Sequence, residues 1–299
     1  MNKVLNRKAK VSVLIPAFNR KNYIGETIES VLSQSYPNIE LIVVDDGSTD
    51  GTFEILEEYS DQKKLTLLTH PGRENRGQSA ALNLGLEEAS GEFVAILDSD
   101  DLFMPDKIAL QVDYLQNNPD VGLVYGMGEA IDEKGNWLYD IHSPEHVERN
   151  DPNEVLLDCY FLLPQNALVR REVFDRVGFF EEGFRAAQDH DMLIRISEQT
   201  KMAFLPIKVF RYRRHQESIS SRGQRRRWEN GFEILHRARA RYPYRRSTIR
   251  KRRAVLHYRM GQVCRREKRY ALATFNLIVS GVLDPARSFR VLTGRERID

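Results

Sequence analysis

The chain of 299 residues contains only two cysteines, Cys159 and Cys264, and neither lies in a metal-ligand spacing. Two isolated cysteines exclude the disulfide framework of a small secreted domain and are typical of a reduced intracellular compartment. Long hydrophobic runs are also missing, because the longest uncharged apolar stretch, residues 271–283, is shorter than the roughly 20 residues that span a bilayer. We therefore expect a cytoplasmic protein, either soluble or peripheral at the inner face of the membrane.

A signal peptide is not expected at the N-terminus. Four basic residues occur within the first ten positions, but the apolar run that follows them is short and is interrupted by Pro16 and Asn19. This pattern favours a β-strand over the longer apolar core of a secretory signal.

Acidic residues are scarce in the last third of the chain. Residues 1–210 carry 20 Lys/Arg and 36 Asp/Glu, whereas residues 211–299 carry 25 and 7. Clusters of basic residues, such as 225–227 and 250–253, bind anionic membranes or anionic acceptors in some proteins and nucleic acid phosphates in others. They also occur as solvated helix faces that pair with acidic segments, and this interpretation stays open. We favour an anionic membrane surface or acceptor and expect no nucleic acid partner.

The most informative motif is an apolar run that ends in three carboxylates. Residues 93–97 read Phe-Val-Ala-Ile-Leu, and Asp98, Asp100 and Asp101 follow. A continuous apolar run is typical of a central parallel strand, and ligands bind at the carboxyl ends of such strands. If the strand persists, Asp98 and Asp100 point the same way and suit Mg²⁺ or Mn²⁺. The alternative is an acidic turn that caps the helix expected near Pro105.

Two further strands are predicted upstream, at residues 11–19 and 39–50, and both end in polar residues. Apolar residues at helical spacing lie between the strands, for example Ile24, Ile28 and Val31. The alternation of strand and helix predicts an α/β fold with a mainly parallel sheet and right-handed crossovers. Three strand ends are therefore expected to converge at one edge.

Five segments in this order resemble the family 2 glycosyltransferases with the GT-A fold. They are Pro16-Ala-Phe-Asn19, Val44-Asp-Asp-Gly-Ser-Thr-Asp50, Asn75-Arg-Gly-Gln-Ser-Ala-Ala-Leu-Asn83, Leu97-Asp-Ser-Asp-Asp101 and Gln188-Asp-His-Asp191. The resemblance implies a GT-A Rossmann-like catalytic domain, mainly parallel and flanked by helices, over residues 1–215. A basic helical C-terminal region would follow at 216–299.

The implied activity is transfer of a sugar, with inversion, from a nucleoside-diphosphate donor to a hydroxyl group. We expect UDP as the nucleotide and a saccharide or lipid-linked acceptor in cell-surface polysaccharide or glycoconjugate synthesis. The resemblance also implies Mn²⁺ or Mg²⁺ as cofactor.

For the donor, the family pattern assigns the nucleotide base to Asp46 and to the end of the first strand, at Pro16, Ala17 and Phe18. Phe18 stands where a tyrosine is frequent, which removes a hydroxyl but keeps a stacking face. Arg76 is a candidate for the base or the diphosphate because Gly77 lets the backbone approach closely, and Arg73 competes for this role. The alternative is that Asp45 and Asp46 only begin the turn that leads to Asp50.

For the metal, the resemblance points to Asp100 as the direct ligand and to Asp98 as a contact of the ribose or of a metal-bound water. Asp101 is expected in the turn before the following helix. His215 belongs to a basic segment that often contacts the diphosphate or the metal in related enzymes, so it is a candidate third ligand, with Arg213 and Ser218 near the same phosphates. A solvated loop histidine is the alternative.

Asp189 matches the family residue that removes the proton of the acceptor hydroxyl. Gln188 replaces the usual glutamate, which puts the acceptor contacts expected there in doubt. The alternative for Asp189 is helix N-capping, with Asp191 as a favourable charge in the first turn.

The sequence also bears on two other classes of protein. A nucleotidyltransferase usually has a glycine-rich phosphate loop with a lysine near the first strand, and residues 16–19 offer none. A non-catalytic membrane or complex adaptor with a degenerate transferase domain would be indicated by loss of Asp100 or Asp189, and both are present.

Overall fold

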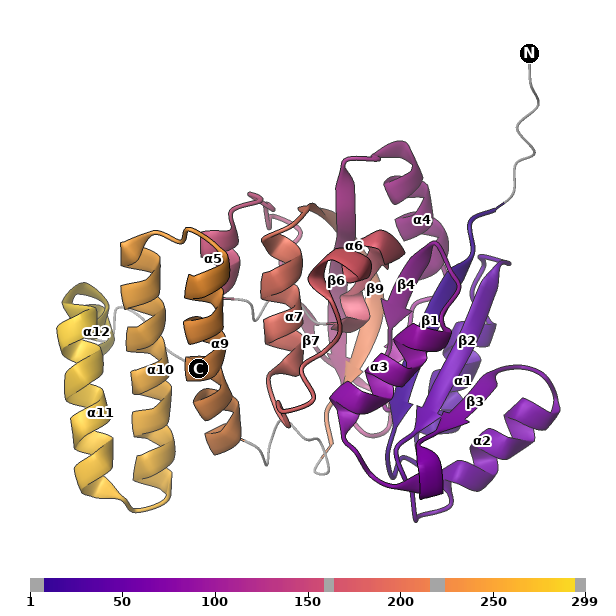
Figure 1. Ribbon diagram of the computed structural model, residues 1–299, viewed down its shortest axis with the longest axis horizontal. Helices are drawn as coiled ribbons and strands as arrows, with labels where there is room; N and C mark the ends of the chain where they lie inside the picture. The colour runs from indigo at the N-terminus through magenta and orange to yellow at the C-terminus, as the bar shows by residue number, and fades with distance from the viewer. Residues whose placement is uncertain (1–7, 159–163, 216–223, 294–299) are drawn as a thin grey trace. The chain divides into compact units, whose positions relative to one another are not determined.

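The computed structural model describes residues 8–158, 164–215 and 224–293 (Figure 1). These residues form two compact units. The first unit contains residues 8–150, 164–183 and 199–215, and the second contains 151–158, 184–198 and 224–293. Cys159 and Ser218 lie outside the described residues.

The first unit is built on one mixed sheet. Its strands are β1 (Val11–Ala17), β2 (Ile39–Asp45), β3 (Thr66–Thr69), β4 (Phe93–Ile96), β5 (Leu102–Phe103), β6 (Val121–Ile131), β7 (Trp137–Ile141), β8 (Ala167–Arg170) and β9 (Lys201–Arg213). They lie in the order β3-β2-β1-β4-β8-β6-β9-β5, and β7 pairs with β6. The pairs β3–β2, β2–β1, β1–β4 and β6–β9 are parallel. The pairs β4–β8, β8–β6, β6–β7 and β9–β5 are antiparallel, so the sheet is mixed and not mainly parallel as expected. The predicted α/β fold class is confirmed.

Helices flank this sheet. They are α1 (Ile24–Leu32), α2 (Thr52–Asp61), α3 (Gln78–Glu88), α4 (Lys107–Asn117) and α6 (Arg171–Val177), with short 3₁₀ turns at η1 (Pro71–Arg73) and η2 (Pro164–Asn166). Helix α3 packs against β1, β2 and β3. All seven residues of β1 are buried, which explains its continuous apolar sequence.

The register of the parallel strands aligns their carboxyl ends. Ala17 at the end of β1 is opposite Asp45 at the end of β2, and Leu14 is opposite Ile96 at the end of β4. Strand β4 ends at Ile96, so Asp98 and Asp100 are not strand residues. The prediction that their side chains point the same way assumed that the strand continues, and it does not. The two residues lie instead in a turn, in which the amide of Asp101 donates to the carbonyl of Asp98.

The second unit is helical. Its elements are α5 (Pro152–Leu157), α7 (Gln188–Ser197), α9 (Gln224–Arg241), α10 (Arg246–Arg266), α11 (Tyr270–Leu283) and α12 (Pro285–Leu292). Helices α9, α10 and α11 lie side by side in Figure 1, and α10 and α11 form a helical hairpin. In the described part of the chain, no helix is both long and apolar enough to cross a membrane.

Candidate active site

The loops after β1 and β2 are tied together by hydrogen bonds. The amide of Asp46 donates to the carbonyl of Ala17 at 2.8 Å. The amide of Asn19 donates to Oγ of Ser48 at 3.0 Å, and Oδ1 of Asn19 accepts from the amide of Thr49 at 2.8 Å. The end of the first strand and Asp46, both assigned to the nucleotide base, are therefore neighbours.

Phe18 follows β1 directly and is 42% exposed. Pro16 and Ala17 belong to the strand, and Ala17 is buried. An exposed aromatic ring at the carboxyl end of a central strand offers a stacking face for a planar ligand.

The carboxylate of Asp46 fixes the loop that precedes α3. Its two oxygens accept hydrogen bonds from the amides of Arg76, at 2.7 Å, and Gly77, at 2.8 Å. Gly77 has φ 92° and ψ 162°, a conformation that is essentially restricted to glycine. The buried Nε2 of His70 lies 3.7 Å from the same carboxylate. Asp46 thus positions the loop that carries both candidate arginines.

The alternative for this motif, in which Asp45 and Asp46 begin the turn that leads to Asp50, describes Asp45 but not Asp46. Oδ2 of Asp45 accepts from the amides of Gly47 and Ser48 at 3.2 and 3.1 Å. Oδ1 of Asp50 accepts from the amide of Thr52, the first residue of α2, at 3.0 Å. These two carboxylates hold the turn, whereas the carboxylate of Asp46 bonds the loop before α3.

The two candidate arginines differ in their surroundings. The guanidinium of Arg73 lies 3.5 Å from the ring centroid of Phe53 and donates to the carbonyl of Ser48 at 3.3 Å. The side chain of Arg76 is 51% exposed and lies 3.7 Å from the carboxylate of Glu182. Arg76 is therefore the better placed of the two to turn toward a bound anion.

The turn after β4 contains carboxylates in different environments. Asp98 accepts from Nε2 of Gln78 at 2.9 Å and from Nε2 of Gln165 at 2.6 Å. Asp101 is completely buried and accepts from Gln165 at 2.6 Å and from the amide of Arg213 at 2.8 Å. Burial, together with the neighbouring charges of Asp100 and Asp98, raises the pKa of Asp101 well above its usual range.

These carboxylates do not cap the next helix, so the alternative interpretation of the motif is wrong. Helix α4 begins at Lys107 with Asp106 as N-cap. Asp101 directly precedes β5 and has an internal structural role.

Asp100 is held between two basic side chains. Its Oδ2 lies 2.9 Å from Nε of Arg20 and 2.9 Å from Nε2 of His215. Burial alone would raise the pKa of Asp100, but the hydrogen bond from His215 and the charge of Arg20 lower it below its usual value. The side chain of His215 is only 1% exposed and its ring packs against Tyr23, so it is not a solvated loop histidine.

Arg213 connects the end of β9 to this turn. Its guanidinium donates to the carbonyl of Asp100 at 3.0 Å, to the carbonyl of Glu133 at 3.2 Å and to the carboxylate of Glu26 at 2.6 Å. Because these partners occupy its guanidinium and the side chain is 2% exposed, Arg213 supports the site and is not available to the phosphates. The expectation of a phosphate contact for Arg213 is therefore wrong.

Asp100 and His215 fit a divalent ion as a pair of neighbouring ligands. Two ligands at right angles, each about 2.1 Å from an octahedral ion, lie about 3.0 Å apart, and Oδ2 of Asp100 is 2.9 Å from Nε2 of His215. The buried Nδ1 of His215 has no hydrogen-bond partner among the described residues. In that part of the chain, no group of three or more His, Cys, Asp or Glu could hold a metal alone. An ion would therefore need phosphate or water ligands as well, which is usual for Mg²⁺.

Asp189 lies in the second unit, in the first turn of α7. Its side chain is 24% exposed, and Oδ2 is 3.9 Å from Nε2 of His190. Burial lowers the pKa of His190 to about 4, and Arg227 donates to its Nε2 at 2.9 Å, so this imidazole is neutral.

The capping alternative for Asp189 is not supported. The N-cap of α7 is Ala187, with φ 64° and no side-chain hydrogen bond. Asp191 does not cap either, because its Oδ2 is paired with Nε of Arg195 at 2.9 Å.

Sequence reasoning missed Arg20 and Gln165. Arg20 comes just after the first strand, so the rule that strand ends carry the site could have identified it. Gln165 is 67 positions from Asp98, and no local pattern marks it.

A model of the family described as "Glycosyl transferase family 2" matches residues 12–178. The chain belongs to glycosyltransferase family 2. The resemblance carried by the five sequence segments is thereby confirmed.

Several curated proteins are similar to this family 2 chain. Glycosyltransferase GlyG of Streptococcus pneumoniae is 31% identical over 70% of this chain and 72% of its own length. An uncharacterized glycosyltransferase of Rickettsia conorii is 35% identical over 71% of this chain and 35% of its own length. TuaG of Bacillus subtilis, whose name provisionally assigns it to teichuronic acid biosynthesis, is 37% identical over 49% of this chain and 58% of its own length. The chain spans between 28% and 60% of the length of five Rickettsia relatives.

Solved structures show the same GT-A fold. S. aureus TarS residues 1–349 in complex with UDP-GlcNAc aligns with a TM-score of 0.68 at 20% identity, over 85% of this chain and 73% of that one. The mannosyltransferase PcManGT from Pyrobaculum calidifontis, in complex with GDP-Man and Mn²⁺, aligns with a TM-score of 0.63 at 21% identity, over 97% of this chain and 80% of that one.

Proposed function

We propose that this family 2 chain transfers a sugar from a nucleoside-diphosphate donor to a hydroxyl acceptor, with inversion at the anomeric carbon. The observation that carries the proposal is the close approach of Asp100 and His215, 2.9 Å apart, beside the carboxyl end of β4. A partly buried carboxylate and imidazole at this edge of a parallel sheet suit the recognition of a metal-bound diphosphate.

Pro16, Ala17, Phe18 and Asp46 are assigned to the nucleotide base. The exposed ring of Phe18 would pack against the base, and an oxygen of Asp46 would accept the N3 proton of uracil. Each carboxylate oxygen has two lone pairs, so Asp46 can accept this bond while it holds the amides of Arg76 and Gly77. These contacts favour UDP as the nucleotide.

Asp98 is assigned to the ribose and Arg76 to the diphosphate. Asp100 and His215 would hold Mn²⁺ or Mg²⁺, which when bound supplies positive charge that stabilises the departing nucleoside diphosphate. Arg20 already neutralises part of the charge on Asp100 at 2.9 Å, and so keeps a buried carboxylate ionised before the donor binds.

Asp189 is assigned as the general base that removes the proton of the acceptor hydroxyl. Its partial exposure leaves the carboxylate accessible, and the neutral His190 beside it adds no positive charge that would weaken a base. We assign donor binding to the predicted catalytic domain, residues 1–215, and an accessory role to the basic region 216–299.

The acceptor is proposed to be a saccharide or lipid-linked hydroxyl compound in cell-surface polysaccharide or glycoconjugate synthesis. The similarity to TuaG supports this class. Such an acceptor would be met at the cytoplasmic face of a membrane, where a peripheral protein can reach it.

The test is release of nucleoside diphosphate from a panel of UDP- and GDP-sugars, with Mn²⁺ and then with EDTA, in the presence of mixed saccharide acceptors. Release from one donor that stops with EDTA and in Asp100→Asn supports the proposal. Asp120→Asn, which changes an exposed carboxylate of the first unit, is the matched control. No release from any donor, with the protein folded and Mn²⁺ bound, would contradict it.

A further inference from the structure

Helix α11 directs its large apolar side chains outward. Its 14 residues include no charged side chain. Phe275, Ile278 and Val282 follow the i, i+3, i+7 spacing of one helix face and are 60%, 62% and 76% exposed. Phe289 on α12 is 60% exposed as well. We call these four residues the apolar face, because exposed apolar side chains that gather on one part of a protein mark an interaction site.

The opposite side of α11 explains this orientation. Its buried residues are the small Ala273 and Ser280, and Oγ of Ser280 donates to the carbonyl of Ala254 on α10 at 2.9 Å. A side chain added at Gly261 on α10 would come within 3.0 Å of Leu277. The two helices therefore pack closely through small residues, which leaves the larger apolar side chains of α11 without a core to enter.

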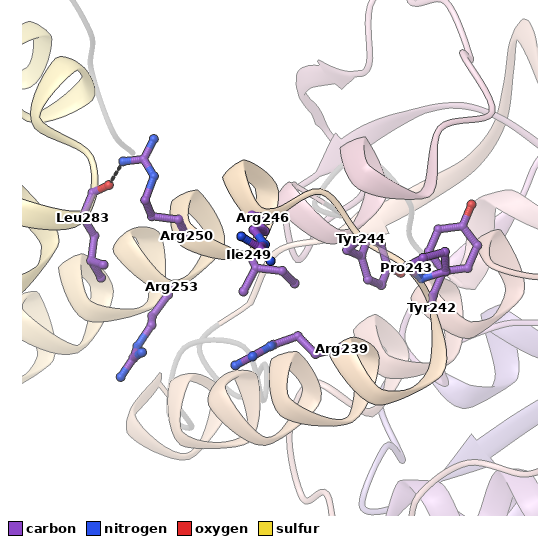
Figure 2. A pocket seen from close by; sticks show the side chains of 9 residues that line it. All are labelled: Arg239, Tyr242, Pro243, Tyr244, Arg246, Ile249, Arg250, Arg253 and Leu283. Atoms are coloured by element: carbon purple, nitrogen blue, oxygen red, sulfur yellow. Dashed lines mark hydrogen bonds between the residues drawn. The ribbon is translucent and has the colours of Figure 1, made fainter.

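A basic pocket of about 430 Å³ lies at the end of this helix (Figure 2). Arg239 of α9 and Arg246, Arg250 and Arg253 of α10 line it. Leu283, the last residue of α11, also lines the pocket, and its carbonyl accepts from Nη1 of Arg250. The arginine pocket therefore lies at the C-terminal end of α11, where Val282 of the apolar face directly precedes Leu283.

None of these four arginines pairs with a carboxylate in the part of the chain that the structure describes. Other C-terminal arginines do, for example Arg241 with Glu198 at 3.0 Å and Arg225 with Glu267. The interpretation that basic clusters pair with acidic residues holds for those arginines and fails for the pocket.

The arrangement of the pocket favours an anion. Arg246, Arg250 and Arg253 lie on one face of α10, where like charges four residues apart repel each other. Helix α10 begins at Arg246 without a side-chain cap, so its positive end faces the same region. A phosphate group would relieve both effects, and guanidinium groups bind phosphate through paired hydrogen bonds.

We propose that α10, α11 and α12 dock on an anionic phospholipid surface, with the arginine pocket holding a headgroup phosphate and the apolar face entering the headgroup–acyl boundary. A membrane supplies the phosphate and the apolar environment side by side. A second copy docked by the same face would instead oppose two sets of unpaired arginines. Helix α11 is about 21 Å long and uncharged, which suits a helix lying in the plane of the interface.

The charge part of the proposal is tested by co-sedimentation of the full chain with vesicles of phosphatidylcholine, alone or mixed with phosphatidylglycerol. Binding is expected only to the mixture and is expected to weaken with salt. Arg246→Gln with Arg253→Gln should lower the affinity about 25-fold, at about fivefold for each arginine. The matched control is Arg265→Gln with Arg266→Gln, which removes the same charge from exposed positions at the other end of α10.

The apolar part is tested with one substitution at two exposed valines. Val282→Ser, on the apolar face, should lower the affinity for the mixed vesicles about tenfold. Val147→Ser, at a position that is 69% exposed in the first unit, should leave it unchanged. Neither change should affect folding, because exposed positions contribute little to stability.

Three results would overturn the proposal. The first is equal binding to both vesicle types, and the second is an equal loss in the two arginine pairs. The third is an absence of binding to the mixed vesicles. A dimer in solution that Val282→Ser dissociates would then assign the surface to a second copy, whereas saturable pyrophosphate binding that Arg246→Gln with Arg253→Gln abolishes would assign the pocket to a free phosphate. These tests do not involve sugar transfer, so their outcome is independent of the proposed function.

Discussion

Nε2 of His215 lies 2.9 Å from Oδ2 of Asp100, although the two residues are 115 positions apart. The pairing of β5 with β9 produces this contact. Leu102 is opposite Arg211 in an antiparallel register, so the chain just before β5 meets the chain just after β9. The carboxylate from the end of β4 and the imidazole from the end of β9 therefore reach the same point.

Arg20 shares Oδ2 of Asp100 with His215, and it should oppose metal binding when no nucleotide is present. Replacing Arg20 with glutamine removes a positive charge 2.9 Å from this oxygen and should strengthen the binding of Mn²⁺ alone about tenfold. Titration calorimetry with MnCl₂ measures this, with Lys21→Gln as a control that removes the same charge from an exposed neighbour. Unchanged or weaker Mn²⁺ binding would mean that Arg20 is needed to orient Asp100.

The strands that position the site were predictable because their chemistry is local. A buried parallel strand requires a continuous apolar run, and β1, β2 and β4 were recognised from such runs. Asp98 and Asp100 are predictable as candidate ligands because they come just after such a run, whereas Asp46 is a candidate through the resemblance to family 2 glycosyltransferases. The precise end of β4 was not predictable, because Leu97 is also buried and apolar although the strand stops at Ile96.

The residues that support the site were not predictable in the same way. Gln165 lies in a 3₁₀ turn and bonds both Asp98 and Asp101 through one nitrogen. Arg213 appeared as one member of an arginine-rich segment, but its buried guanidinium joins Asp100 to Glu26. Such contacts depend on the tertiary register of distant strands, and neither spacing nor composition reveals them.

Asp46→Asn should weaken nucleotide binding and loosen the loop before α3. An amide would direct an N–H group at one of the two backbone amides that now donate to the carboxylate, which should cost about 1–3 kcal/mol of stability. UDP and UDP-sugar should lose affinity equally, because the base is common to both. Calorimetry and thermal unfolding measure these effects. A stability loss with unchanged UDP affinity would assign Asp46 to the loop alone.

Asp189→Asn should reduce kcat by about 10²–10⁴ while the dissociation constant of the donor stays nearly unchanged, since a general base acts in the transition state and not in donor binding. Single-turnover kinetics and donor titration separate the two effects. Asp191→Asn is the matched comparison on the same helix. Its carboxylate is buried and bonds Arg195, so this change should lower thermal stability instead. A comparable loss of donor affinity in Asp189→Asn would make Asp189 a structural residue.

His142 should make the fold sensitive to mild acid. Burial, with a smaller contribution from His146, lowers the pKa of His142 from 6.5 to about 4. Between these values the unfolded chain binds more protons than the folded chain, so the free energy of unfolding falls as the pH decreases.

Replacing His142 with asparagine removes this titration, and asparagine tolerates the local φ of 71°. The variant should therefore lose less stability than the wild type between pH 6.5 and about 4, as measured by urea unfolding. Parallel stability curves for the two proteins would show that His142 is not the group responsible.

The most direct test of the account is calorimetric titration of UDP- and GDP-sugars into the protein, first with Mn²⁺ and then with EDTA, with Asp100→Ala as the variant. We expect one nucleotide sugar to bind in the presence of Mn²⁺, and we expect that binding to be lost with EDTA and in the variant. An absence of binding across the whole panel, or binding that neither EDTA nor the variant changes, would contradict the metal-assisted donor site at Asp100 and His215.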